Sequence, residues 1–102
     1  MTFAQAQTMN QAPGAFRPGS MPAVRLLIVE DDTSLATGLM RALSNEGYDV
    51  SAAVNGEEAL ERVRSEPYDM LVLDIGLPGI DGFEVLRRLR AGGYALPVLI
   101  LT

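Results

Sequence analysis

Carboxylates carry most of the chemistry that this sequence offers. Glu30, Asp31 and Asp32 directly follow the aliphatic run 24–29, and Asp74 follows a second aliphatic run at 70–73. The 102 residues contain no Cys or His, and all 8 basic residues are Arg. These absences exclude a disulfide framework, a Ser-His-Asp triad, a His- or Cys-ligated metal and a lysine Schiff base. Oxygen ligands from grouped carboxylates favour a hard divalent ion, Mg²⁺ or Mn²⁺.

Four short β-type segments alternate with three helical segments, and these elements must position the acids. Strands are expected at 24–29, 48–54, 70–73 and 97–101, and helices are expected after Asp32, over 57–66 and after Asp81. The links between strands are long enough for helical crossovers, so the pattern predicts an α/β fold with a parallel sheet. The first and third strands are the most apolar and belong in the centre, whereas the more polar second strand belongs at an edge. The predicted strand order is therefore 2-1-3-4.

Apolar residues at helical spacing predict which helix faces enter the core. The expected core positions are Leu35, Ala36, Leu39, Ala42 and Leu43 in the first helix, Ala59, Leu60 and Val63 in the second, and Phe83, Leu86 and Leu89 in the third. Asn55 and Gly56 are expected to form a turn. Gly47 is expected to end the first helix and Pro67 the second.

The predicted strand order has a consequence for the acids. It places a topological switch point between the first and third strands, and ligands of open α/β sheets bind outside the carboxyl ends of the strands at such a point. Glu30, Asp31 and Asp74 lie at those two strand ends, about 4.8 Å apart in the sheet. Carboxylates this close repel one another, so either one is protonated or a cation is bound. The alternative is that these acids are only solvated residues and helix caps.

Three blocks of sequence, in order, resemble one known family. LLIVEDD, LDIGLPGIDG and PVLILT are similar to the receiver domain of two-component response regulators, over residues 24–102. The sequence pattern GLP…DG…VLRRLR…PVLILT is most similar to the OmpR/PhoB-type subgroup. The resemblance implies a flavodoxin-like three-layer sandwich that accepts a phosphoryl group from a sensor histidine kinase. Receivers of this subgroup precede a winged-helix DNA-binding domain, so the implied function is regulation of transcription by phosphorelay, and the chain is expected not to be an enzyme.

The resemblance also assigns roles to individual residues of this chain. Asp74 corresponds to the phosphoacceptor. Glu30 and Asp31 correspond to the acidic pair that organises Mg²⁺, and Gly76 corresponds to the position whose backbone carbonyl reaches the metal. The remaining assignments are a switch hydroxyl and two residues that shape the loop before the third helix: Thr102, Pro78 and Gly82.

The chain departs from the family pattern at its C-terminal end. It stops after the fourth strand, so we expect the fifth strand, its lysine and the DNA-binding domain to be missing. Residues 23–102 are then a partial receiver domain. Residues 1–22, rich in Gln, Ala, Pro and Gly, are expected to form a disordered N-terminal extension.

Two alternative functions stay open at this point. The first is a truncated fragment that cannot be phosphorylated and acts only in protein interaction. The second is a magnesium-dependent phosphohydrolase with an aspartate nucleophile, which would need a second acid two residues after Asp74. Gly76 occupies that position and counts against it.

Composition sets limits on location and partners. No apolar run approaches membrane-spanning length, and the N-terminal stretch lacks the apolar core of a signal peptide. A cytoplasmic protein without membrane contact is therefore expected. The net charge of −5 argues against nucleic-acid binding by this chain alone. The expected partners are a sensor histidine kinase, a second copy in a homodimer of the full-length form, and DNA only through the missing domain.

Overall fold

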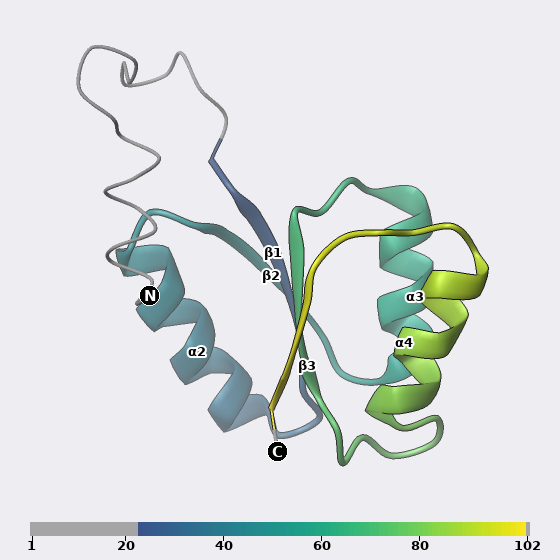
Figure 1. Ribbon diagram of the computed structural model, residues 1–102. Coiled ribbons are helices and arrows are strands. Elements are labelled where there is room, and N and C mark those ends of the chain that lie inside the picture. The colour runs from purple at the N-terminus through teal and green to yellow at the C-terminus, as the bar shows by residue number, and fades with distance from the viewer. Residues whose placement is uncertain (1–22, 102) are drawn as a thin grey trace, which may run out of the picture.

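The computed structural model describes residues 23–101, which form a parallel sheet between two layers of helices (Figure 1). The strands are β1 (Arg25–Val29), β2 (Asp49–Ala53), β3 (Met70–Asp74) and β4 (Val98–Leu101), and the helices are α2 (Thr33–Asn45), α3 (Gly56–Ser65) and α4 (Gly82–Ala91). The strand order is β2-β1-β3-β4 and every neighbouring pair is parallel. The predicted α/β three-layer sandwich and its strand order are thus confirmed. The predicted extension 1–22 and the predicted switch residue Thr102 lie outside the described residues.

Each strand alternates its side chains between two apolar layers. One layer contains Leu27, Leu71 and Leu73 and is covered by residues of α3 and α4. The opposite layer contains Ile28 and Val72 and is covered by α2. Figure 1 shows α2 on one side of the sheet and α3 with α4 on the other. The two central strands, β1 and β3, are therefore buried on both faces, which agrees with their nearly continuous aliphatic sequences.

All three helices begin with a side-chain cap at the carboxyl edge of the sheet. The side chain of Asp32 accepts the N–H of Leu35, that of Asn55 accepts the N–H of Glu58, and that of Asp81 accepts the N–H of Glu84. Such a cap stabilises a helix by about 1 kcal/mol. The predicted turn at Asn55 and Gly56 is therefore wrong. Asn55 is the cap and Gly56 is the first residue of α3, because Asn satisfies an N-cap as well as a turn.

The predicted inner face of α2 is partly wrong. Ala36 and Leu43 are buried as expected, but Leu35 is 47% exposed and Ala42 is also exposed. Met40 packs against the core instead. Leu35 and Ala42 lie roughly a quarter turn from the centre of the packed face, at 100° per residue. The excess of apolar residues made the stripe wider than the surface that the sheet can cover.

The inner face of α4 is also displaced from its predicted position. Val85 and Leu89 are fully buried, and Leu86 is half-buried. Phe83, predicted to be core, is 57% exposed. It lies more than a quarter turn from the packed face because the helix turns its glycine Gly82, rather than the ring, toward the end of β3. The predicted inner residues of α3 are all buried, which confirms that face.

Pro67 and Gly47 follow helix ends, as expected. Helix α3 ends at Ser65, and Gly47 follows α2 with a φ of 96°, a conformation that glycine adopts without strain. Among residues 23–101, no helix combines the length and the hydropathy that crossing a bilayer requires.

Candidate metal and phosphoacceptor site

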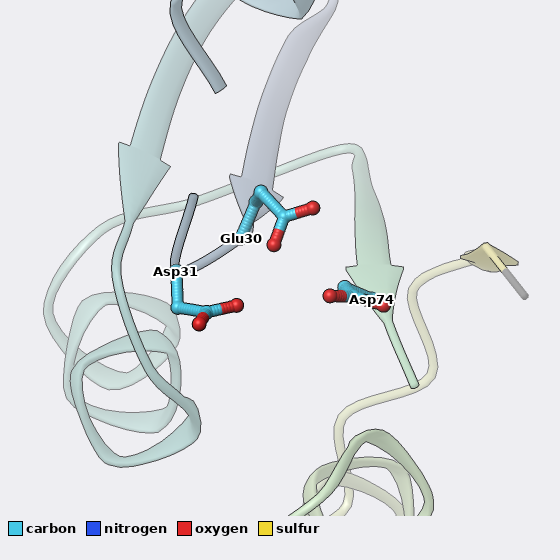
Figure 2. Close-up of side chains that lie close together, drawn as sticks. All are labelled: Glu30, Asp31 and Asp74. Atoms are coloured by element: carbon cyan, nitrogen blue, oxygen red, sulfur yellow. The ribbon is translucent and has the colours of Figure 1, made fainter. Parts of the chain in front are cut away.

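Three carboxylates meet at the carboxyl edge of the sheet. Glu30 and Asp31 follow β1, and Asp74 is the last residue of β3. Each offers one oxygen, and these oxygens all lie within 4.8 Å of one another. Figure 2 shows the three side chains turned toward a shared space between the two strand ends. The predicted convergence of Glu30, Asp31 and Asp74 is therefore found.

Strand pairing fixes where these side chains start. The N–H of Glu30 donates to the carbonyl of Ala53 at 3.0 Å, which extends the β1–β2 ladder by one residue. On the other side, Val29 is paired with Leu73, so Glu30 and Asp74 are next to one another across the β1–β3 pair. Parallel neighbours bring their carboxyl ends to one edge, so the acids meet although Asp31 and Asp74 are 43 positions apart in the sequence.

The fourth acid of the region has a different role. Asp32 follows Asp31 directly, but its side chain caps α2 by accepting the N–H of Leu35 at 3.1 Å. It is not one of the three converging carboxylates. The reading of these acids as helix caps is thus correct for Asp32 alone, and the cap leaves Glu30 and Asp31 available to the site.

The three carboxylates differ in burial, and this sets the electrostatics of the site. Glu30 is 5% exposed and is the one buried charged residue among residues 23–101, Asp74 is half-buried and Asp31 is exposed. Burial raises the pKa of Glu30, the N–H of Asp32 at 3.3 Å partly opposes this, and the carboxyl groups of Asp74 and Asp31 raise it further. The group of acids is therefore unfavourable in its fully ionised form, and a proton or a cation relieves it.

The loop 75–81 orients the carboxylate of Asp74. The N–H of Gly76 donates to Asp74 Oδ1 at 3.1 Å. Farther along, Gly79 has a φ of 75°, which an L side chain rarely adopts, next to the exposed Pro78. The chain therefore turns tightly at Gly79. The structure brings Gly76 to Asp74 through its N–H, and the role of its carbonyl stays a prediction.

Gly82 closes this loop against the end of β3. Its N–H donates to the carbonyl of Ile75 at 3.2 Å. A Cβ at Gly82 would lie 2.9 Å from the Asp74 carbonyl oxygen and 2.9 Å from the Ile75 Cα. No side chain fits there, because both neighbours are backbone. The expected role of Gly82 in shaping the loop thus has a steric basis.

Sequence reasoning missed one residue that anchors the loop. Leu77 is 5% exposed and belongs to the core cluster beneath α3 and α4. The signal was available, since Leu77 is an aliphatic residue between Gly76 and Pro78 in an otherwise turn-forming stretch. Its burial ties the loop to the core one residue after the contact between Gly76 and Asp74.

Comparison with known proteins identifies the family of this chain. The family described as the response regulator receiver domain matches residues 26–102. The chain belongs to this family. The matched stretch contains all three acids of the site and the whole described sheet except the start of β1.

Two curated relatives are a response regulator and a transcriptional regulatory protein. This receiver domain is 49% identical over 80 residues to the response regulator MprA of Mycobacterium ulcerans, which covers 78% of this chain and 34% of that protein. It is 44% identical over 101 residues to the transcriptional regulatory protein TcrA of Mycobacterium tuberculosis, which covers 98% of this chain and 40% of that protein. The chain thus spans a little over a third of the length of these relatives.

Solved structures confirm the receiver fold. The receiver domain of the Francisella response regulator 1452 matches with a TM-score of 0.74 and 31% identity, over 76% of this chain and 64% of that one. The chemotaxis response regulator CheY4 of Vibrio cholerae matches with a TM-score of 0.74 and 27% identity, over 78% of this chain and 68% of that one. These likenesses extend over nearly all of the described residues.

Proposed function

We propose that this receiver domain accepts a phosphoryl group on Asp74 and that Glu30, Asp31 and Asp74 hold the Mg²⁺ that supports the transfer. The observation that carries the proposal is the meeting of three carboxylate oxygens within 4.8 Å at the switch point of the sheet. Asp74 is the suitable acceptor, because it is half-buried and oriented by the loop, whereas Glu30 is enclosed.

The donor set fits a hard cation such as Mg²⁺ better than a metal that prefers nitrogen or sulfur ligands. All three side-chain ligands are carboxylates, and Mg²⁺ prefers oxygen ligands and is bound by a few carboxylates together with phosphate oxygens. The carbonyl of Gly76 would complete the protein ligands. When bound, Mg²⁺ offsets the negative charge of the carboxylates and of a phosphoryl group. This cluster fits such an ion because burial, and then the carboxyl groups of Asp74 and Asp31, raise the pKa of Glu30, and a counter-charge would offset both effects.

The part of this chain in the transfer is to position the carboxylate of Asp74. An oxygen of Asp74 forms a bond to phosphorus while the bond from phosphorus to the donor's imidazole nitrogen breaks, which leaves an acyl phosphate on Asp74 and a free imidazole on the donor. The Gly76 N–H fixes one carboxylate oxygen, Oδ1, and so limits the rotation of the group. Glu30, which is buried beside Asp74, contributes charge rather than a bond to phosphorus.

The role of the whole protein extends this proposal. We infer that the donor is a phosphohistidine of a sensor histidine kinase in the cytoplasm and that the chain acts as a signalling module rather than an enzyme. The similarity to MprA and to the transcriptional regulatory protein TcrA supports an output in transcription, through a DNA-binding region beyond residues 23–102 and a homodimer of the full-length form. Thr102 would be the switch residue of that assembly.

Phosphoryl uptake tests the proposal directly. The chain is incubated with Mg²⁺ and acetyl phosphate, a small acyl phosphate donor, and its intact mass is measured. We expect one added phosphoryl group on the wild type and none on Asp74→Asn. Asp81→Asn is the matched control, because it removes one charge from the same loop while Asn remains a good helix cap. It should be modified like the wild type.

Two results would contradict the proposal in different ways. Modification of Asp74→Asn would show that another residue is the acceptor. Mg²⁺ binding without any phosphoryl uptake, from acetyl phosphate and from a phosphorylated kinase alike, would favour the alternative of a fragment that acts only in protein interaction. Release of phosphate from simple phosphomonoesters would instead favour the phosphohydrolase.

A further inference from the structure

The first turn of α3 is pressed against the loop that follows Asp74. A Cβ at Gly56 would lie 2.6 Å from Ile80 Cγ1 and 2.9 Å from Ile80 Cδ1, and also 2.5 Å from Val85 Cγ2. Ile80 belongs to the loop 75–81, and Val85 is fully buried in α4. The next helix residue, Glu57, reaches the same loop, since its Oε2 lies 3.7 Å from the Cβ position of Gly79. The absence of a side chain at Gly56 therefore permits this contact.

The backbone conformation of Gly56 does not require glycine. Among the described glycines, positive φ angles occur at Gly47, Gly79 and Gly93 but not at Gly56. Alanine is also a better helix former than glycine. The only obstacle to a larger residue at Gly56 is thus steric, and it comes from two side chains, of which Ile80 is in the loop and Val85 is in the helix behind it.

The loop transmits a displacement of Ile80 to Asp74 because it is held at both ends. At its start, the N–H of Gly76 donates to Asp74 Oδ1. At its end, Gly82 lies against the backbone of Asp74 and Ile75 with no room to move closer. Ile80 is only two residues before Gly82 and packs against the core. A shift at Ile80 therefore has to be taken up inside a loop of seven residues that also contains the contact between Gly76 and the Asp74 carboxylate.

We propose that Gly56 is a positioning residue. Because it has no side chain, Ile80 can pack directly against the first turn of α3, and the position of Ile80 in turn sets the placement of the Asp74 carboxylate relative to Glu30 and Asp31. This inference rests on the proposed function for its consequence, since the placement matters through the divalent-ion site. It assigns a part in the site to the start of α3, which supplies none of the three acids.

The test is a pair of glycine-to-alanine variants of the full 102-residue chain. Gly56→Ala adds a methyl group where no space exists, and Gly38→Ala adds one in the middle of α2 with nothing within 4 Å. Both place alanine in a helix, so helix propensity favours each of them. Mg²⁺ binding is measured by calorimetry, and the backbone amides of Gly76 and Gly79 are followed by NMR without the ion. We expect Gly56→Ala to weaken Mg²⁺ binding about tenfold and to shift both amides, and Gly38→Ala to do neither.

A double-mutant comparison separates positioning from general loosening of the fold. Ile80→Ala removes two of the three close atoms and Val85→Ala removes the third. If Ile80 transmits the displacement, adding Gly56→Ala should change the Mg²⁺ affinity and the Gly76 amide much less in the Ile80→Ala background than in the Val85→Ala background. Equal effects in both backgrounds, or unshifted amides in folded Gly56→Ala, would overturn the proposal.

The proposal can still be tested if a variant unfolds or if the wild type binds no Mg²⁺. Should Gly56→Ala fail to fold, Ile80→Val replaces it: loss of the terminal methyl group should loosen this packing and raise the Mg²⁺ dissociation constant about twofold, and an unchanged constant contradicts the proposal. Should the wild type bind no Mg²⁺, the proposed function fails, whereas the Gly76 amide still reports whether Gly56 positions the loop.

Discussion

Removing the charge of Asp74 should stabilise the metal-free protein. Asp74→Asn keeps the size of the side chain, and its Oδ1 can still accept the N–H of Gly76. Two charges at 4.8 Å, the outer limit for this cluster, repel by about 1 kcal/mol in bulk water and by about 3.5 kcal/mol at an effective dielectric constant of about 20. Asp31 is exposed, so solvent screens its charge and the lower part of this range applies. We expect the free energy of unfolding to rise by about 1–2 kcal/mol at pH 8.

Urea unfolding with and without the ion measures this effect. In a chelator, Asp74→Asn should be the more stable protein. In Mg²⁺ the order should reverse, because an ion at a hundredfold excess over its dissociation constant stabilises the wild type by about 2.7 kcal/mol. The variant, with two carboxylates instead of three, should gain much less. Asp81→Asn serves as the control, since it also removes one charge but lies at a helix cap outside the cluster.

One result would refute this reasoning: without the metal, Asp74→Asn is no more stable than the wild type, while the control Asp81→Asn has the same free energy of unfolding as the wild type. Repulsion among the carboxylates would then not govern how this site affects stability. An equal gain from Mg²⁺ in the wild type and in Asp74→Asn would show, independently, that the ion binds elsewhere.

Three further predictions concern the loop, the site's protonation and the surface. Gly82→Ala should lower the free energy of unfolding by about 1–3 kcal/mol in urea titrations, because its Cβ meets backbone atoms at 2.9 Å that cannot move aside cheaply. The pKa of Glu30 is raised above 4.5, so in the metal-free protein the folded state binds the Glu30 proton more tightly than the unfolded state does. The free energy of unfolding should therefore fall as the pH rises from 4.5 through the raised pKa. Glu30→Gln should flatten the plot of the free energy of unfolding against pH in that interval. Hydrogen bonds from Arg87 and Arg88 lower the pKa of Glu84 to about 2, so its contribution is present above pH 4.5 and is lost as the pH falls toward 2. Acid titrations of Glu84→Gln, followed by circular dichroism, should lack that part of the transition.

The sequence alone determined the order of the sheet and the meeting of the acids. Two nearly continuous aliphatic strands had to be central, since a strand with no polar face must be buried on both sides. Long links made the strands parallel, and parallel strands deliver their carboxyl ends to one edge. Glu30 and Asp74 could therefore be placed together from residue types and spacing, with no knowledge of side-chain contacts.

The helix faces were less predictable for a specific reason. In α2 and α4, apolar residues cover more of the helix surface than the sheet can bury, so their spacing does not decide which side of the helix faces the core. In the folded protein the buried sides leave Leu35 and Phe83 exposed. Likewise, an Asn-Gly pair fits a turn and a helix start equally well, and in the structure Asn55 caps a helix that begins at Gly56.

Tertiary structure also decided what distinguishes the three acids from one another. Their side chains are chemically alike, and neighbouring residues in the sequence differ sharply in burial: Glu30 is enclosed and Asp31 is exposed. Which carboxylate loses its water depends on the strands and helices packed around it, and these come from distant parts of the chain. The sequence thus determined that the acids meet, because chain direction fixes strand ends. Only the packed fold determined their unequal burial, the raised pKa of Glu30 and the position of the loop that orients Asp74.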